Sequence, residues 1–129
     1  MEDYILREID KIGELLLQIA IRLGLFKDGE PNYTVADVKS EFGKTELAMN
    51  LDEILSKENP ILYLVEHEGI SDRGLETFID ILYHSDMDET RRNTLLNDAL
   101  RYLDHKGYYS FRLHSLSTHQ RKKERINNL

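Results

Sequence analysis

The chain of 129 residues contains no cysteine. This absence excludes disulfide bonds, thiol nucleophiles, iron–sulfur clusters and thiolate zinc sites. Proline occurs only twice and valine only three times, whereas leucine occurs twenty times. Because leucine favours helix and valine favours strand, this composition predicts an all-α fold. Leucine, isoleucine, valine and phenylalanine together number 38 residues, which is enough for one hydrophobic core.

Basic residues are also scarce, with 17 Lys and Arg against 24 Asp and Glu and a net charge of −7. A net negative charge disfavours binding of the whole chain to nucleic acid or to an anionic membrane. No apolar run reaches the roughly 20 residues that a membrane span needs. The opening MEDYILREID carries acids where an export signal carries bases, so we expect a cytoplasmic protein. The length predicts a single domain over residues 1–129.

The clearest helical pattern covers residues 3–23, within a first segment, 1–26, that we expect to form a long amphipathic helix. Asp3 is the expected N-cap and Gly24 the expected C-terminal stop. Apolar residues spaced alternately four and three apart form a seam, which we call the helix-one seam: Ile5, Ile9, Ile12, Leu16, Ile19, Leu23 and Phe26. This seam either packs on the second half of the same chain or binds a protein partner, including a second copy in a homodimer.

A string of short helices is predicted over residues 34–69, because a turn or capping residue stands at each joint. Thr34 caps the first of them, which ends at Gly43. Thr45 caps the second. The pair Asn59-Pro60 starts the third, since Asn is a good N-cap and Pro fits the first helical position.

The segment 71–107 is predicted to form an antiparallel helical hairpin. Ser71 or Asp72 caps its first helix, and Asp88 caps its second helix after a three-residue turn. So short a connection between two helices places them side by side and antiparallel.

An aromatic cluster follows the hairpin and precedes a basic terminal helix. The cluster comprises Tyr108, Tyr109 and Phe111, and it is expected either to plug the core under the terminal helix or to contact a ligand or partner. Ser117 and Gln120 have the spacing of a capping box, which predicts that the terminal helix covers 117–129.

Large and small side chains of the hairpin resemble those of one tetratricopeptide repeat: Leu75, Ile79, Tyr83, Leu96 and Ala99. Asp80 and Arg92 stand where that repeat has small residues at the helix crossing. The order of segments along the whole chain, from the opening DYILREI through NLDEIL at 50–55 to the ending at 117–125, resembles a family of uncharacterised bacterial all-helical proteins. The resemblance implies a cytoplasmic all-α fold with a tetratricopeptide-like C-terminal hairpin, and it carries no activity and no catalytic residues.

Motifs for catalysis or metal binding are incomplete. Asp80 and His84 are four residues apart on one predicted helix, but two ligands fall short of a metal site, and either a hydrogen bond at the surface or a histidine at the edge of the core explains them. The acidic run at 86–89 lacks the glycine that a calcium loop needs at its sixth position, where Arg91 stands. The triplet at 43–45 lacks the earlier glycine of a phosphate loop. We therefore predict no cofactor, no metal and no enzymatic activity.

Charge is unevenly distributed along the chain. Residues 112–129 carry a net charge of +4, whereas the other 111 residues carry −11. The basic side chains of this ending, which we call the basic tail, are Arg112, Arg121, Lys122, Lys123 and Arg125. They either lie on the acidic body of the same chain or meet an acidic partner or nucleic acid. Residues 34–55 look superficially like a helix-turn-helix, but the acids on the second helix would repel phosphates, so core packing is the better interpretation.

Together these patterns predict a non-enzymatic protein-interaction or scaffold module that binds a protein partner or itself and no membrane. The candidate contact residues are the helix-one seam first and the aromatic cluster at 108–111 second. The alternative is a small nucleic-acid-binding or regulatory protein that uses the basic tail, although nucleic acid is the less favoured partner.

Overall fold

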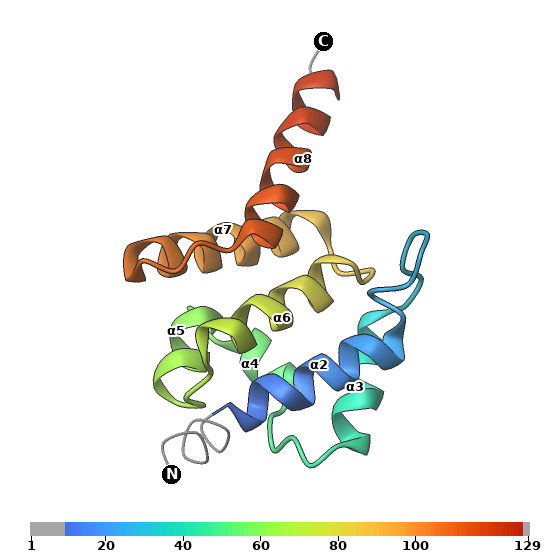
Figure 1. The fold of residues 1–129 in the computed structure, drawn as a ribbon, viewed down its shortest axis with the longest axis vertical. Coiled ribbons are helices and arrows are strands. Elements are labelled where there is room, and N and C mark those ends of the chain that lie inside the picture. The colour runs from blue at the N-terminus through green and yellow to red at the C-terminus, as the bar shows by residue number, and fades with distance from the viewer. Residues whose placement is uncertain (1–9, 128–129) are drawn as a thin grey trace.

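The computed structural model describes residues 10–127, with the backbone alone for 121–127. Over this range the chain is all-helical, as predicted. The elements are α2 (Lys11–Leu23), α3 (Val35–Lys44), α4 (Leu51–Ser56), α5 (Pro60–Glu66), α6 (Asp72–Tyr83), α7 (Glu89–Lys106) and α8 (Phe111–Asn127) (Figure 1).

Helix α6 is the central element of the core, because α2 packs on one side of it and α7 on another (Figure 1). Leu16 and Ile19 of α2 and Phe78 of α6 are fully buried. Gly13 and Gly74 allow a close approach of α2 and α6: a Cβ atom at Gly74 would lie only 3.5 Å from the Cα of Gly13. The absence of a Cβ atom at both positions lets the two backbones come together.

Several predicted helix boundaries are confirmed by the hydrogen bonds of their caps. Thr34 and Asp37 form a reciprocal capping box at the start of α3. The side chains of Asn59, Ser71 and Asp88 each accept a bond from a backbone N–H in the first turn of the helix that follows. Gly24 ends α2 with a φ of 82° and Gly107 ends α7 with a φ of 88°, a left-handed conformation that glycine adopts without strain.

The long first helix is not confirmed, because α2 has 13 residues and begins at Lys11. Asp10 occupies its N-cap position without a capping hydrogen bond of its own. Instead, the Asp10 carboxylate accepts a hydrogen bond from the hydroxyl of Ser71, with 2.6 Å between the oxygens, which ties the start of α2 to the start of α6. The predicted N-cap at Asp3 lies outside the described residues.

The prediction that Thr45 starts the second short helix is wrong. Its hydroxyl donates to the carbonyl of Phe42, so Thr45 closes α3 rather than opening another helix. Helix α4 begins at Leu51, where the Asn50 side chain accepts from the N–H of Glu53. Residues 45–50 form no helix, and Leu47 and Met49 are both buried. Their burial at alternate positions explains why apolar spacing alone was misleading.

The predicted start of the terminal helix at Ser117 is also wrong, because α8 begins six residues earlier, at Phe111. The hydroxyl of Ser110 accepts a bond from the N–H of Leu113, and this cap opens the helix. Ser117 lies inside α8 and is buried together with Leu113 and Gln120. These three positions are spaced four and three apart, so they form the face of α8 that packs on the body.

Helices α6 and α7 run antiparallel, since the Nζ of Lys106 at the end of α7 lies 2.9 Å from a carboxylate oxygen of Asp72 at the start of α6. The likeness of this pair to a tetratricopeptide unit stays a prediction. Helix α8 packs with its first half against α6 and α7, and its second half extends away from the rest of the molecule (Figure 1).

Candidate interaction site at the root of helix α8

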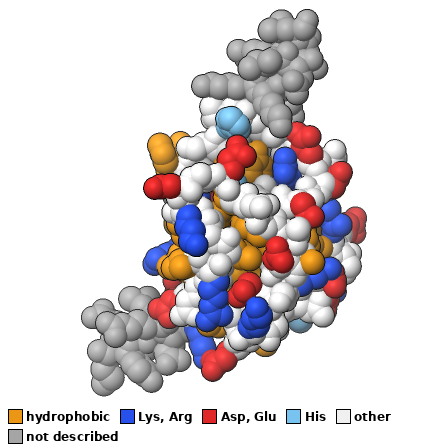
Figure 2. Space-filling view, turned by 90° about the vertical axis from the view of Figure 1, so that its right-hand side faces the viewer, with side chains coloured by type: hydrophobic (Ala, Val, Ile, Leu, Met, Phe, Trp, Pro, Cys, Tyr) orange, Lys and Arg blue, Asp and Glu red, His pale blue; other side chains and the backbone are white. Residues whose placement is uncertain are grey.

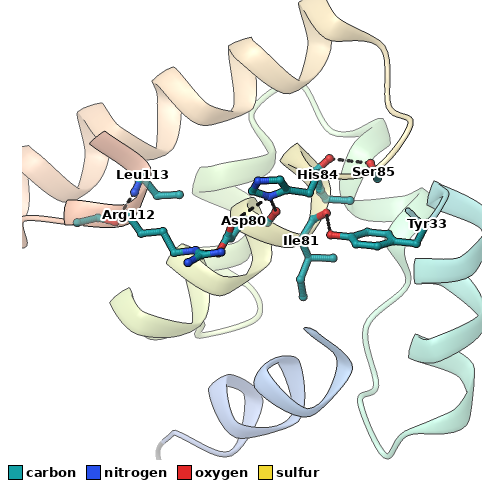
Figure 3. A network of polar contacts seen from close by, with 9 residues as sticks. Tyr33, Asp80, Ile81, His84, Ser85, Arg112 and Leu113 are labelled. Carbon is teal, nitrogen blue, oxygen red and sulfur yellow. Dashed lines mark hydrogen bonds and ion pairs between the residues drawn. The ribbon is translucent and has the colours of Figure 1, made fainter. Parts of the chain in front are cut away.

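A buried charged network joins the first turn of α8 to the middle of α6. Asp80 is 1% exposed and lies within an otherwise apolar run of α6, residues 78–82. One carboxylate oxygen of Asp80 accepts a hydrogen bond from the Nε of Arg112, and the other lies 3.1 Å from the Nδ1 of His84 (Figure 3). Removing a carboxylate from water is costly, and the hydrogen bond from Arg112 together with the charge of a protonated His84 offsets that cost.

His84 is held by Asp80 through two contacts. Besides the side-chain contact, its Nδ1 lies 2.9 Å from the backbone carbonyl oxygen of Asp80 (Figure 3). Burial lowers the pKa of the His84 imidazole, but the hydrogen bonds to Asp80 outweigh burial and the opposing charge of Arg112, so that the pKa is raised above its ordinary value of 6.5. The site therefore favours a protonated imidazole.

Arg112 also reaches the loop that follows α2. Its guanidinium lies 5.0 Å from the ring centre of Phe26, within the range of a cation–π contact. Farther along the same loop, the hydroxyl of Tyr33 donates to the carbonyl of Ile81 at 2.6 Å, and burial raises the pKa of that phenol (Figure 3). These contacts connect the start of α8, residues 109–114, which we call the root of α8, to the centre of α6 and to the loop at 24–33.

The aromatic cluster divides into a buried part and an exposed part. Tyr108 is half-buried and packs against the core. Tyr109 and Phe111 are 68% and 77% exposed. Tyr109 stacks on the ring of His114, with 4.5 Å between ring centres, and the Nε2 of His114 lies 2.9 Å from a carboxylate oxygen of Asp104. Tyr109 is thereby held in place on the surface.

Phe111 points away from the body because of its position on α8. Leu113 is fully buried, and at 100° per residue Phe111 lies about 200° around the helix from it. An exposed phenylalanine in the first turn of a helix contributes nothing to the core. Tyr109 and Phe111 are exposed two residues apart in the sequence, and a concentration of exposed aromatic side chains is typical of contact sites, whereas a single exposed apolar residue is ordinary.

The helix-one seam packs inside the chain over its described part. Leu16 and Ile19 are fully buried in the core, and Ile12 and Leu23 are half-buried against it. Ile5 and Ile9 lie outside the described residues. Phe26, the last member of the seam, is 48% exposed beside Arg112.

The basic tail follows the exposed aromatic residues along α8. Arg112 is committed to Asp80, as described above. The backbone of α8 carries Arg121, Lys122, Lys123 and Arg125 in the half of the helix that extends from the body (Figure 1). On the face shown in Figure 2, acidic and basic side chains are interspersed, so that face presents no continuous area of one sign.

Other predicted sites can be assessed only within the described part of the chain. There, no group of three or more potential ligands among His, Asp and Glu could hold a metal ion, and no helix is long and apolar enough to cross a membrane. No protein-family model, no curated protein and no solved structure matches the chain. The resemblance to a bacterial helical family therefore stays a prediction.

Reasoning from the sequence missed the part that Asp80 plays. From the sequence, Asp80 is a departure from a repeat pattern and half of an incomplete metal site, and Arg112 belongs to a basic tail that either lies on the acidic body or meets an acidic partner or nucleic acid. The pairing of these two residues is not predicted. The signal was the run Phe78-Ile79-Asp80-Ile81-Leu82, in which an acid is surrounded by apolar residues. A buried acid needs a cation, and the nearest unassigned basic residue beyond the hairpin is Arg112.

Proposed function

We propose that this protein is a non-enzymatic interaction module that binds a protein partner through the root and extended half of α8. The supporting observation is the exposure of Tyr109 and Phe111 at the start of a helix whose second half leaves the body. Aromatic side chains dominate the energetics of protein interfaces because they bury a large area at a low cost in conformational entropy.

The partner surface that suits this helix is apolar with an acidic border. Two aromatic residues at the root of α8 require apolar contacts, and the net charge of +3 on residues 113–129, beyond the paired Arg112, favours acidic groups farther along. The network of Asp80 and Arg112 supports the proposal because it holds the first turn of α8 in a fixed position. A contact surface that is already ordered loses less entropy on binding.

The proposal also retains three predictions about the whole chain. These are a cytoplasmic setting, membership of an uncharacterised bacterial helical family, and a tetratricopeptide-like hairpin formed by α6 and α7. A second copy of this chain is one candidate partner, although the burial of Leu16 and Ile19 leaves the middle of the helix-one seam inaccessible to it.

The test compares capture of partners by two double variants of the full chain. Tyr109→Ser with Phe111→Ser removes the exposed aromatic pair, and Ile21→Ser with Leu62→Ser removes exposed apolar side chains elsewhere as a matched control. We expect a stoichiometric protein partner to be captured from native lysate by the natural chain and by the control but not by the aromatic variant. Capture that is equal for all three chains would contradict the proposal.

The same experiment separates the alternative functions. Nucleic acid that is captured alone and released by salt would support a nucleic-acid-binding protein that uses the basic tail. Light scattering across a concentration series measures self-association, and a dimer that the aromatic variant fails to form would identify a second copy as the partner.

A further inference from the structure

A second site lies next to the root of α8, in a pocket of about 390 Å³. Its walls come from the end of α6, the first half of α7, the middle of α8 and the loop at 29–31. The polar side chains that line it are Glu30, Tyr83, His84, Ser85, Arg92, His119 and Gln120. A pocket of several hundred Å³ is the usual size of a small-molecule site.

Arg92 is the cation of this pocket, and it has no anionic partner among the described residues. Its guanidinium lies over the ring of Tyr83, with 5.3 Å to the ring centre. Its Nε is buried and makes no hydrogen bond. By contrast, Arg22, Arg101 and Arg112 each lie beside a carboxylate. The outer nitrogens of the Arg92 guanidinium are the ones that a ligand can reach, and together they can donate two parallel bonds to one oxyanion.

The two histidines of the pocket provide further donors. The Nδ1 of His84 is engaged by Asp80, so the Nε2 of the same ring is the atom left for a ligand. His119 enters the wall from α8. Besides Asp80 behind His84, two acids lie nearby: Glu30 at the pocket wall and Glu89, which accepts a hydrogen bond from Gln120 at 3.4 Å. Glu30 and Glu89 are the two at the surface. Both are exposed, and repulsion between charges is weak where water surrounds them.

From this arrangement we infer that the pocket binds a small organic oxyanion, with its phosphate or carboxylate group on the Arg92 guanidinium and the imidazoles of His84 and His119 beside it. At roughly 30 Å³ per water-sized group, an inorganic anion would fill only part of the volume. The remaining space accommodates an organic body against Tyr83 and Leu116. This inference does not depend on the proposed partner of α8.

Titration of the full chain with inorganic phosphate and, separately, with succinate tests this inference. Amide chemical shifts at 83–85, 92 and 119 are followed by NMR. We expect a saturable change for at least one probe, and Arg92→Gln should weaken its binding about tenfold or more, the range for a hydrogen bond to a charged group. Arg101→Gln is the control, since it removes the same charge from an exposed position of α7, and it should change binding by less than about twofold.

Each outcome decides the inference. Saturation by phosphate alone assigns a phosphate ligand, saturation by succinate alone assigns a carboxylate, and either supports the site. Non-saturable shifts, equal weakening by both variants, or no response of these amides up to tens of millimolar of both probes would overturn it. Arg92→Lys keeps the charge but loses the two-pronged donor, so if Arg92→Gln fails to fold, this variant should fold and weaken binding several-fold.

Discussion

Helix α6 has two kinds of neighbour, and they are attached to it by different means. On one side, α2 packs through Leu16, Ile19 and a crossing of two glycines, and over its described residues, 11–23, α2 contributes no charged side chain to the buried core. On the other, α8 is attached through the buried carboxylate of Asp80 and the guanidinium of Arg112. Burial of apolar surface is non-directional, whereas a charge-assisted hydrogen bond requires its donor and acceptor to meet in a narrow range of geometries.

The two contacts of α6 therefore have different roles in the molecule. The α2–α6 contact supplies stability, because burial of large aliphatic side chains is the main favourable term in folding. The α6–α8 contact supplies position, because the bond from Arg112 to Asp80 fixes the first turn of α8. The buried face of Leu113, Ser117 and Gln120 then sets the direction in which the helix leaves the body. For a helix that presents a contact surface, a fixed orientation relative to the body matters more than a large contribution to the free energy of unfolding.

The largest loss of stability is expected from a substitution in the apolar contact between α2 and α6. Leu16→Ala leaves a cavity in the fully buried contact and should lower the free energy of unfolding by about 3 kcal/mol, measured by urea denaturation. Ile21→Ala on the exposed side of the same helix is the control and should change stability by less than about 0.5 kcal/mol. Equal costs for the two variants would mean that α2 does not pack as described.

A smaller loss of stability, confined to α8, is expected when the contact between Arg112 and Asp80 is removed. Arg112→Gln should cost about 2 kcal/mol, because it removes a charge-assisted bond. The cost should stay below that of a fully buried pair, since the Arg112 side chain is 45% exposed. Hydrogen exchange should show the loss in the amides of α8, while those of α2 stay protected.

A double-mutant cycle with Asp80→Asn checks that the two residues act on each other. We expect the combined cost of Asp80→Asn and Arg112→Gln to be smaller than the sum of the single costs by about 1 kcal/mol or more. Strictly additive costs would show that Arg112 stabilises α8 in some other way, for example through its contact with Phe26.

The contact between His84 and Asp80 should make the stability of the protein depend on pH. Its pKa is raised in the folded protein, so the stability that protonation contributes is complete below the ordinary value of 6.5 and is lost as the pH rises through the higher folded value. Stability of the natural chain should therefore exceed that of His84→Gln by more at pH 5.5 than at pH 8.5. A stability difference between the two chains that is independent of pH would contradict the contact with Asp80.

The sequence was sufficient to predict the parts of the fold that depend on local rules. Capping residues at Thr34, Asn59, Ser71 and Asp88 were identified because each satisfies backbone donors within its own first turn. The errors arose where a tertiary contact overrides a local signal. Ser117 resembles a cap in the sequence, but it is buried inside α8.

The candidate site was less predictable for the same reason. The aromatic cluster was located, but its division into a half-buried Tyr108 and exposed Tyr109 and Phe111 depends on where α8 begins. The contact between Asp80 and Arg112 spans 32 residues, and no local pattern joins positions so far apart. The pocket around Arg92 is formed by four segments, and it emerges only when the chain is folded.

The smallest effect on stability is expected from the residues assigned to the partner. Phe111→Ser and Tyr109→Ser should each change the free energy of unfolding by less than about 0.5 kcal/mol, because neither side chain is in the core. Thermal or urea denaturation of the single variants measures this, with Tyr108→Ser as a half-buried neighbour that should cost more. If Phe111→Ser destabilised the protein as much as Tyr108→Ser, the ring of Phe111 would contribute to the stability of the fold. If Phe111→Ser keeps the stability of the natural chain but no longer captures the partner, the ring of Phe111 acts in binding. The two neighbours of α6 then differ in function as well as in their contacts, because α2 stabilises the fold and α8 presents a binding surface.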